Sequence, residues 1–238
     1  MNGSGSLLGP GFEDIYLTAG DGVRLNAWFF AAPAGASRAH LVLLLLHGNA
    51  GNISHRVGYY AGWRELGLNV FAVDYRGYGL SEGRPGEEGT YLDAQAAYAW
   101  LRGRGFRPEQ IVVLGESLGG GVASELALRE PMGGLVLQST FTRIVDVGAD
   151  LFPWLPVRWM NTIKYDTLSK LPRIRVPLLI MHSRQDTYVR FHHAERNLAA
   201  ASPPKLLWEI VGEHTQTLEA GRALYLRGLD QYLRAHFA

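Results

Sequence analysis

The sequence predicts an α/β fold with a mostly parallel central sheet of about eight strands and helices on both faces. Apolar runs without alternation recur along the chain, as is typical of strands that are buried on both faces. Segments of helical length separate these runs. Repetition of strand and helix implies right-handed crossovers, and therefore parallel strands.

The first two predicted strands have a different pattern. Residues 13–18 and 23–30 flank the turn Gly20-Asp21-Gly22, and apolar residues alternate with polar ones in the second strand. Alternation indicates one buried face, so we expect an antiparallel hairpin at the edge of the sheet. We expect residues 1–11 to be a flexible lead-in and residues 12–238 to form a single domain.

The remaining strands are expected to be buried. They are predicted at 41–46, 70–73, 111–114, 135–137, 178–181 and 205–211. Helices are predicted at 90–104, 122–129 and 219–236.

Composition excludes several classes of function. The net charge of +1 gives no field that would attract nucleic acid. The absence of cysteine excludes disulfides, thiolate metal sites and a cysteine nucleophile. No metal-binding or P-loop motif is present, so we expect neither a metal nor a cofactor. Because no basic segment followed by an apolar stretch opens the chain, we expect a cytoplasmic protein, with a removed anchor or export signal as the alternative.

A short motif follows the predicted strand at 111–114. Residues 115–119, Gly-Glu-Ser-Leu-Gly, fit G-x-S-x-G, and a predicted helix comes next. Strand, tight turn and helix are the context that a nucleophile elbow requires, because the turn strains the serine backbone and lifts its hydroxyl above the sheet. Flanking glycines let the strand and helix backbones approach closely. Ser117 is therefore a candidate nucleophile, and a plain Gly-Ser turn is the alternative.

A serine nucleophile needs a base and a carboxylate that orients the base. Asp186 follows the predicted strand at 178–181, and His214 follows the last predicted strand. Each of the three residues comes just after the carboxyl end of a strand, so Ser117, Asp186 and His214 can converge on one crevice. We therefore predict a catalytic triad in the order serine, acid, histidine.

Other titratable residues have simpler interpretations. We expect His47 to be satisfied by local hydrogen bonds, while the loop at 47–52 offers backbone N–H groups to the crevice. Asp74 is expected to stabilise its own loop by pairing with Arg76, and Glu213 is expected to face solvent. His182, His192 and His193 do not follow the final strand, and the sequence shows no ligand-spaced cluster of histidine and aspartate.

A long insertion follows the strand at 135–137. Connections of this length are usually functional, so we predict a small cap over the crevice at about 141–172. Its substrate-facing residues are expected to be Phe141, Phe152, Trp154 and Trp159. The alternative is a core helix that closes the sheet.

Three segments carry a resemblance to a known family. His-Gly-Asn-Ala-Gly-Asn at 47–52, Asp-Tyr-Arg-Gly-Tyr-Gly-Leu-Ser at 74–81 and Gly-Glu-Ser-Leu-Gly-Gly at 115–120 resemble the Bem46-like branch of the α/β-hydrolases. The likeness runs from about residue 12 to the end and includes Asp186 and His214 in their loops. It departs from the family pattern at Ser183, where glycine is usual, and at Arg190, where proline is common.

The resemblance implies an α/β-hydrolase fold with Ser117 as nucleophile, His214 as base and Asp186 as the residue that orients it. It also implies an oxyanion hole formed by the backbone N–H groups of Asn49 and Leu118. The expected function is cleavage of small carboxylic esters through an acyl-enzyme. An acyl-protein or acyl-CoA thioesterase is the alternative among enzymes. A non-catalytic binding module, or a membrane-peripheral protein that uses the apolar stretch 152–160, is the alternative of another class.

Overall fold

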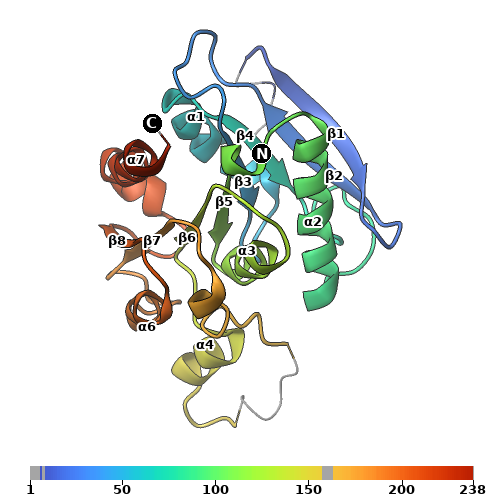
Figure 1. Ribbon diagram of the computed structural model, residues 1–238. Coiled ribbons are helices and arrows are strands. Elements are labelled where there is room, and N and C mark those ends of the chain that lie inside the picture. The colour runs from blue at the N-terminus through green and yellow to red at the C-terminus, as the bar shows by residue number, and fades with distance from the viewer. Residues whose placement is uncertain (1–5, 7–8, 157–162, 238) are drawn as a thin grey trace.

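A computed structural model describes residues 6, 9–156 and 163–237, and these form one eight-stranded sheet in the order β1-β2-β4-β3-β5-β6-β7-β8 (Figure 1). The strands are β1 (Phe12–Thr18), β2 (Arg24–Phe30), β3 (Val42–Leu46), β4 (Asn69–Val73), β5 (Ile111–Glu116), β6 (Gly134–Gln138), β7 (Leu178–Ser183) and β8 (Lys205–Ile210). The mostly parallel sheet predicted from the sequence is confirmed. Most of the expected lead-in at 1–11 lies outside the described residues.

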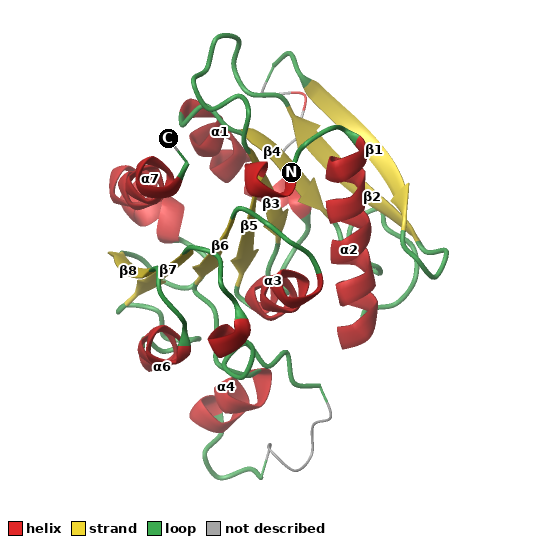
Figure 2. Cartoon of the chain, viewed as in Figure 1, coloured by secondary structure: helices red, strands yellow, loops and turns green. Residues whose placement is uncertain are grey.

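Helices cover both faces of the sheet (Figure 2). They are α1 (Val57–Glu65), α2 (Glu87–Gly103), α3 (Leu118–Arg129), α4 (Ile144–Leu151), α6 (His192–Ala200) and α7 (Thr217–His236). Short 3-10 helices lie at Ile53–Arg56, Pro108–Gln110 and Leu171–Arg173. None of the helices in the described part of the chain has the length and apolar composition needed to cross a bilayer.

The edge hairpin forms as predicted, with β1 antiparallel to β2 and β2 antiparallel to β4, whereas the other neighbours are parallel. Leu25 and Ala27 are fully buried, as the alternation indicates. Asn26 departs from the pattern, because it is buried although a polar residue was expected to face solvent. Its side-chain amide donates a hydrogen bond to Asp14 Oδ1 at 2.7 Å, and this bond compensates for burying the polar side chain.

Two apolar layers sandwich the sheet. Helices α2, α3 and α6 contribute to the layer on one face, and α1 and α7 contribute to the layer on the other. Every residue of β3 and of β4 is buried, which explains why their sequences show no alternation.

The carboxyl ends of the parallel strands position the loops that carry the candidate site. β5 lies near the centre of the sheet and leads directly into α3, and β7 and β8 lead into the loops that hold Asp186 and His214. The connection from β6 to β7 contains α4, which projects beyond α3 and α6 in Figure 1. Residues at the carboxyl ends of several strands therefore meet at one edge of the sheet.

Candidate active site

Ser117 occupies a strained turn between β5 and α3. Its backbone has φ 51°, a left-handed value that is unfavourable for a residue other than glycine. The Ser117 N–H donates to the carbonyl oxygen of Gln138 at 2.9 Å, which ties the turn to β6. This is the backbone conformation expected of a nucleophile elbow.

The flanking glycines allow the close packing that this turn needs. A Cβ on Gly115 would collide with the backbone of Gly119, and a Cβ on Gly119 would collide with the carbonyl of Leu46. The interpretation of both glycines as sites of close backbone approach is confirmed.

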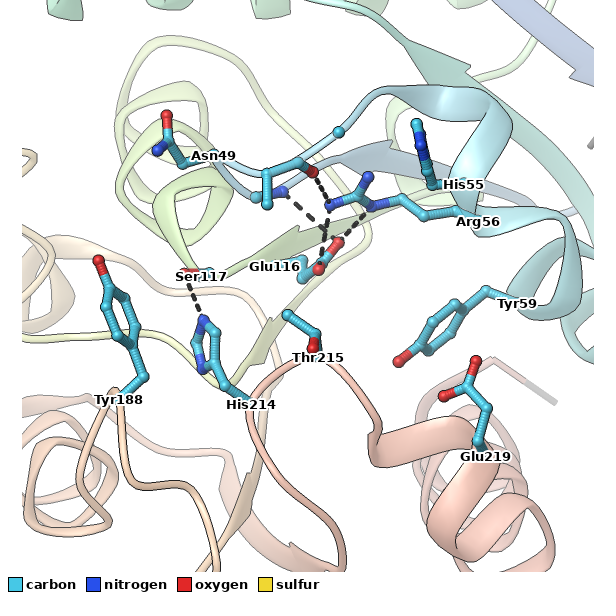
Figure 3. A pocket seen from close by; sticks show the side chains of 13 residues that line it. Asn49, His55, Arg56, Tyr59, Glu116, Ser117, Tyr188, His214, Thr215 and Glu219 are labelled. Carbon is cyan, nitrogen blue, oxygen red and sulfur yellow. Dashed lines mark hydrogen bonds and ion pairs between the residues drawn. The ribbon is translucent and has the colours of Figure 1, made fainter. Parts of the chain in front are cut away.

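The structure brings Ser117, His214 and Asp186 together in a hydrogen-bonded run, of which Figure 3 shows the contact between Ser117 and His214. His214 Nε2 lies 2.9 Å from Ser117 Oγ, and His214 Nδ1 lies 2.7 Å from Asp186 Oδ2. The Asp186 side chain is fully buried, whereas the His214 ring stays partly exposed. With a proton on Nδ1 held by the carboxylate, His214 presents an unprotonated Nε2 to the serine hydroxyl.

Backbone groups fix the acid in its loop. Asp186 Oδ1 accepts the N–H groups of Tyr188 at 3.0 Å and Val189 at 2.8 Å, which leaves Oδ2 for the histidine. Ser183, which stands where the resemblance led us to expect glycine, accepts the N–H of Gln185 through its hydroxyl at 3.0 Å. The departure at Ser183 therefore adds a hydrogen bond to the loop.

Side chains also join the loop that carries Asp186 to the loop that carries His214. Gln185 Oε1 accepts the N–H of Gly212 at 2.6 Å, and Glu213 Oε2 accepts the N–H and the hydroxyl of Thr187. Glu213 is exposed, as expected, yet it links two loops rather than facing solvent alone. Tyr188 lies beside the His214 ring with 5.1 Å between ring centroids, a contact that no sequence pattern indicated.

Two backbone N–H groups near Ser117 are available to an anion. Within the described residues, neither the N–H of Asn49 nor that of Leu118 donates to a protein acceptor. Leu118 is the first residue of α3, where helical N–H groups have no internal partner. The N–H of the preceding Gly48 is directed at Glu116 Oε2, at 3.5 Å. The resemblance implied these two groups as the oxyanion hole, and that role stays a prediction.

A nearly buried ion pair lies beside the elbow, and sequence reasoning missed it. Arg56 donates to Glu116 through two nitrogens, at 2.6 and 3.2 Å (Figure 3). It also donates to the carbonyls of Ala50 and Asn52. Burial is the largest single influence on Glu116 and would raise its pKa, but the charge and hydrogen bonds of Arg56, together with smaller contributions from His47 and the Gly48 N–H, outweigh it and lower that pKa. The pair anchors the loop that carries Asn49 to the residue that precedes Ser117.

The expected pairing of Asp74 with Arg76 is wrong. Asp74 Oδ1 lies 3.2 Å from His47 Nε2, while Arg76 binds Asp93 and Asp21 at 2.8 and 2.6 Å. His47 also donates through Nδ1 to the carbonyl of the next residue at 2.7 Å, in agreement with the predicted local role. Because Asp93 lies on α2, it reaches Arg76 from another element, which the local sequence cannot reveal.

Two cavities meet at Ser117, and both are also lined by Asn49 and Tyr188. One cavity is lined by the charged side chains Arg56, Glu116 and Glu219, is called the polar cavity below, and has a volume of about 570 Å³. The other has no charged residue among its described lining residues, is called the apolar cavity, and has a volume of about 370 Å³. The other polar-cavity residues are Gly48, Ala50, Gly51, His55, Arg56, Tyr59, Glu116, His214, Thr215 and Glu219. The other apolar-cavity residues are Tyr78, Pro85, Gly86, Leu118, Phe141, Ile144, Ile163 and Tyr165.

The aromatic residues expected in the cap are not all at the site. Phe141 lines the apolar cavity and is only 2% exposed. Phe152 and Trp154 are 45% and 73% exposed and line neither cavity. Trp159 lies outside the described residues. The other residues of the predicted cap that line the apolar cavity are Ile144, Ile163 and Tyr165.

One cluster of histidine and aspartate lies away from the elbow, although the sequence spacing did not suggest it. Ligand-capable atoms of Asp150, His192 and His193 lie within 4.8 Å of one another. His193 Nδ1 accepts the N–H of Thr142 at 3.2 Å, so its other nitrogen can donate to Asp150 Oδ2 at 3.1 Å. Both ring nitrogens are thereby satisfied by protein groups, and the expectation of no metal stays a prediction.

Known proteins resemble the chain over most of its length. The model of the alpha/beta hydrolase fold family matches residues 42–166. An uncharacterized protein of Mycobacterium tuberculosis is 38% identical over 93% of this chain and 79% of its own. The lysophosphatidylserine lipase ABHD12 of Danio rerio is 33% identical over 80% of this chain and 59% of its own.

Solved structures share the fold. The Pyrococcus furiosus esterase Pf2001 superposes with a TM-score of 0.83 at 22% identity, covering 100% of this chain and 97% of the esterase. The strand order, the strained serine between β5 and α3 and the sequence matches agree with one another. The chain therefore belongs to the α/β-hydrolase family.

Proposed function

We propose that the protein is a serine hydrolase that cleaves carboxylic esters through an acyl-enzyme. The observation that carries this proposal is the hydrogen-bonded run from Ser117 Oγ through the His214 ring to Asp186. A serine hydroxyl becomes an effective nucleophile when such a base takes its proton.

Acylation follows from this arrangement. Ser117 Oγ attacks the ester carbonyl while its proton passes to His214 Nε2, and Asp186 stabilises the resulting imidazolium. Negative charge develops on the carbonyl oxygen, where the N–H groups of Asn49 and Leu118 can donate to it. The tetrahedral intermediate then collapses, and the alcohol leaves with the proton from His214 Nε2.

Deacylation repeats these steps with water. His214 Nε2 takes a proton from water as the water oxygen attacks the acyl carbon. The second intermediate releases the carboxylic acid and returns the proton to Ser117 Oγ. Each proton removed by the histidine is thus given back within one turnover.

The comparisons support an ester as the substrate class. One relative is named a lysophosphatidylserine lipase, and a protein with the same fold is named an esterase. We also propose that residues 12–238 form one domain of the Bem46-like branch, with residues 141–172 as its cap. The motifs at 47–52 and 115–120 support this assignment.

The test is hydrolysis of matched acyl esters and acyl thioesters by the wild type and by Ser117→Ala. We expect a loss of turnover on the order of 10⁴-fold or more, with an unchanged melting temperature. Ser169→Ala, at an exposed serine that lines neither cavity, is the matched control and should keep full activity. Equal ester turnover in Ser117→Ala and the wild type would refute the proposal. Faster turnover of the thioesters would favour a thioesterase instead.

A further inference from the structure

The two cavities at Ser117 differ in which catalytic group they contain. In the described part of the chain, His214 lines the polar cavity but not the apolar one, and Leu118 lines the apolar cavity but not the polar one. This difference bears on how a substrate lies, because the two halves of an ester need different neighbours in the proposed reaction.

The leaving alcohol must be close to the histidine. Its oxygen takes the proton from His214 Nε2, so the alcohol half of the ester extends to the side where His214 lies. That side is the polar cavity. The acyl half then extends to the apolar cavity, where Leu118, Phe141 and Ile144 form an apolar wall and no described lining residue is charged. This orientation rests on the proposed function.

The charges of the polar cavity are unbalanced. Its lining holds one cation, Arg56, and two carboxylates, Glu116 and Glu219. The donors of Arg56 are directed at Glu116 and at two backbone carbonyls, so its charge is already compensated by protein groups. With histidines counted as neutral, the lining carries a net charge of −1.

Glu219 carries the excess charge. It is exposed, it lies in the first turn of α7, and no hydrogen bond or ion pair engages its carboxylate within the described part of the chain. Figure 3 shows this carboxylate beside the Tyr59 hydroxyl, at the end of the cavity away from Tyr188. An unpaired carboxylate at the edge of a cavity is a favourable neighbour for an organic cation.

We propose that the polar cavity receives the alcohol half of the ester and selects an alcohol that carries an ammonium group, with Glu219 as its counter-charge. Anionic alcohols, including the phosphate-bearing thiol of acyl-CoA, meet a like charge there. Glu219 is a specificity-determining residue in this arrangement, and it takes no part in the bond changes at Ser117.

The experiment compares three esters of one short acyl chain, with choline, with its uncharged isostere 3,3-dimethylbutanol and with anionic 2-hydroxyethanesulfonate. For the wild type we expect kcat/KM to fall in that order, with the choline ester favoured about three- to tenfold over its isostere. The preference should shrink as salt is added, because the carboxylate is exposed. Glu219→Gln should bring the ratio of choline to isostere close to one. Glu195→Gln, an equal charge change on the exposed side of α6, should leave the ratio intact.

A purely structural role of Glu219 predicts a different result. An acidic residue in the first turn stabilises a helix, so the Gln variant would then melt earlier and keep the preference. Thr215→Lys, which places a cation in the same cavity, tests the proposal independently and should reverse the order of the charged esters. A wild type that hydrolyses all three esters equally, or that prefers the anionic ester, would overturn this inference and leave the ester hydrolase proposal standing. Failure to hydrolyse any of them, the uncharged ester included, would overturn both.

Discussion

Glu116→Gln should destabilise the fold, because it removes the counter-charge of an almost fully buried guanidinium. Arg56 is 6% exposed, and Glu116 accepts from two of its nitrogens. Removal of one partner from a buried ion pair typically costs about 3–5 kcal/mol, and the amide oxygen of Gln keeps one acceptor. We therefore expect a loss of about 3 kcal/mol, which for a chain of this length lowers the melting temperature by about 6–12 °C.

Thermal and urea unfolding of five variants would measure this effect: Glu116→Gln, Arg56→Met, Glu116→Met, the double Met variant and Glu65→Gln. Arg56→Met combined with Glu116→Met should be less destabilising than the sum of the two single changes, because neither charge is left alone. Glu65→Gln breaks an ion pair with Arg222 whose side chains are 58% and 46% exposed, and it should change stability far less. A loss below about 1 kcal/mol for Glu116→Gln, or strict additivity in the double variant, would refute the assigned role of this pair.

Two further predictions concern the binding of the acyl chain in the apolar cavity and the stability of the fold at acidic pH. Ile144→Trp fills part of the apolar cavity and should shift the preference towards shorter acyl chains in a series of esters. Trp154→Ala, at an exposed residue, should leave this chain-length profile unchanged. Identical profiles for Ile144→Trp and the wild type would contradict the location of the acyl chain. Burial, reinforced by the neighbouring His192 charge, lowers the pKa of His193 from 6.5 to about 4. Between these two pH values the unfolded chain therefore binds more protons than the folded protein. The free energy of unfolding should fall as the pH is lowered through this window. Urea unfolding at a series of pH values should show that the free energy of unfolding of His193→Gln depends less on pH than that of the wild type. An equal pH dependence in the two proteins would contradict this role of His193.

The sheet could be predicted because its signals are local. Apolar runs without alternation in β3 and β4 reflect burial on both faces, and the alternation in β2 reflects an edge hairpin. Helices α1 and α6 were not predicted. The sequence of α1 contains two glycines among nine residues, and in α6 three buried residues, His193, Ala194 and Asn197, do not make an apolar stripe.

The positions of the proposed triad residues could be predicted because each follows the carboxyl end of its own strand. Chain order and strand endings were sufficient to select Ser117, Asp186 and His214. The Arg56–Glu116 pair could not be found in this way, because its partners are 60 residues apart and meet only through the crossover from β3 to β5. Trp154 was expected to face the substrate but lines neither cavity. The reason is related, because the local sequence does not indicate whether an aromatic residue after α4 faces a cavity or solvent.

The most direct test of the central claim is to label the folded protein with a fluorophosphonate and to locate the adduct by peptide mass spectrometry. The account predicts a single adduct, on Ser117, that is absent from heat-denatured protein and from His214→Ala. Asp186→Asn should react more slowly, because the amide no longer favours the histidine tautomer that takes the serine proton. An adduct on another serine, or equal labelling of Ser117 in folded and denatured protein, would contradict the claim that the fold activates this residue.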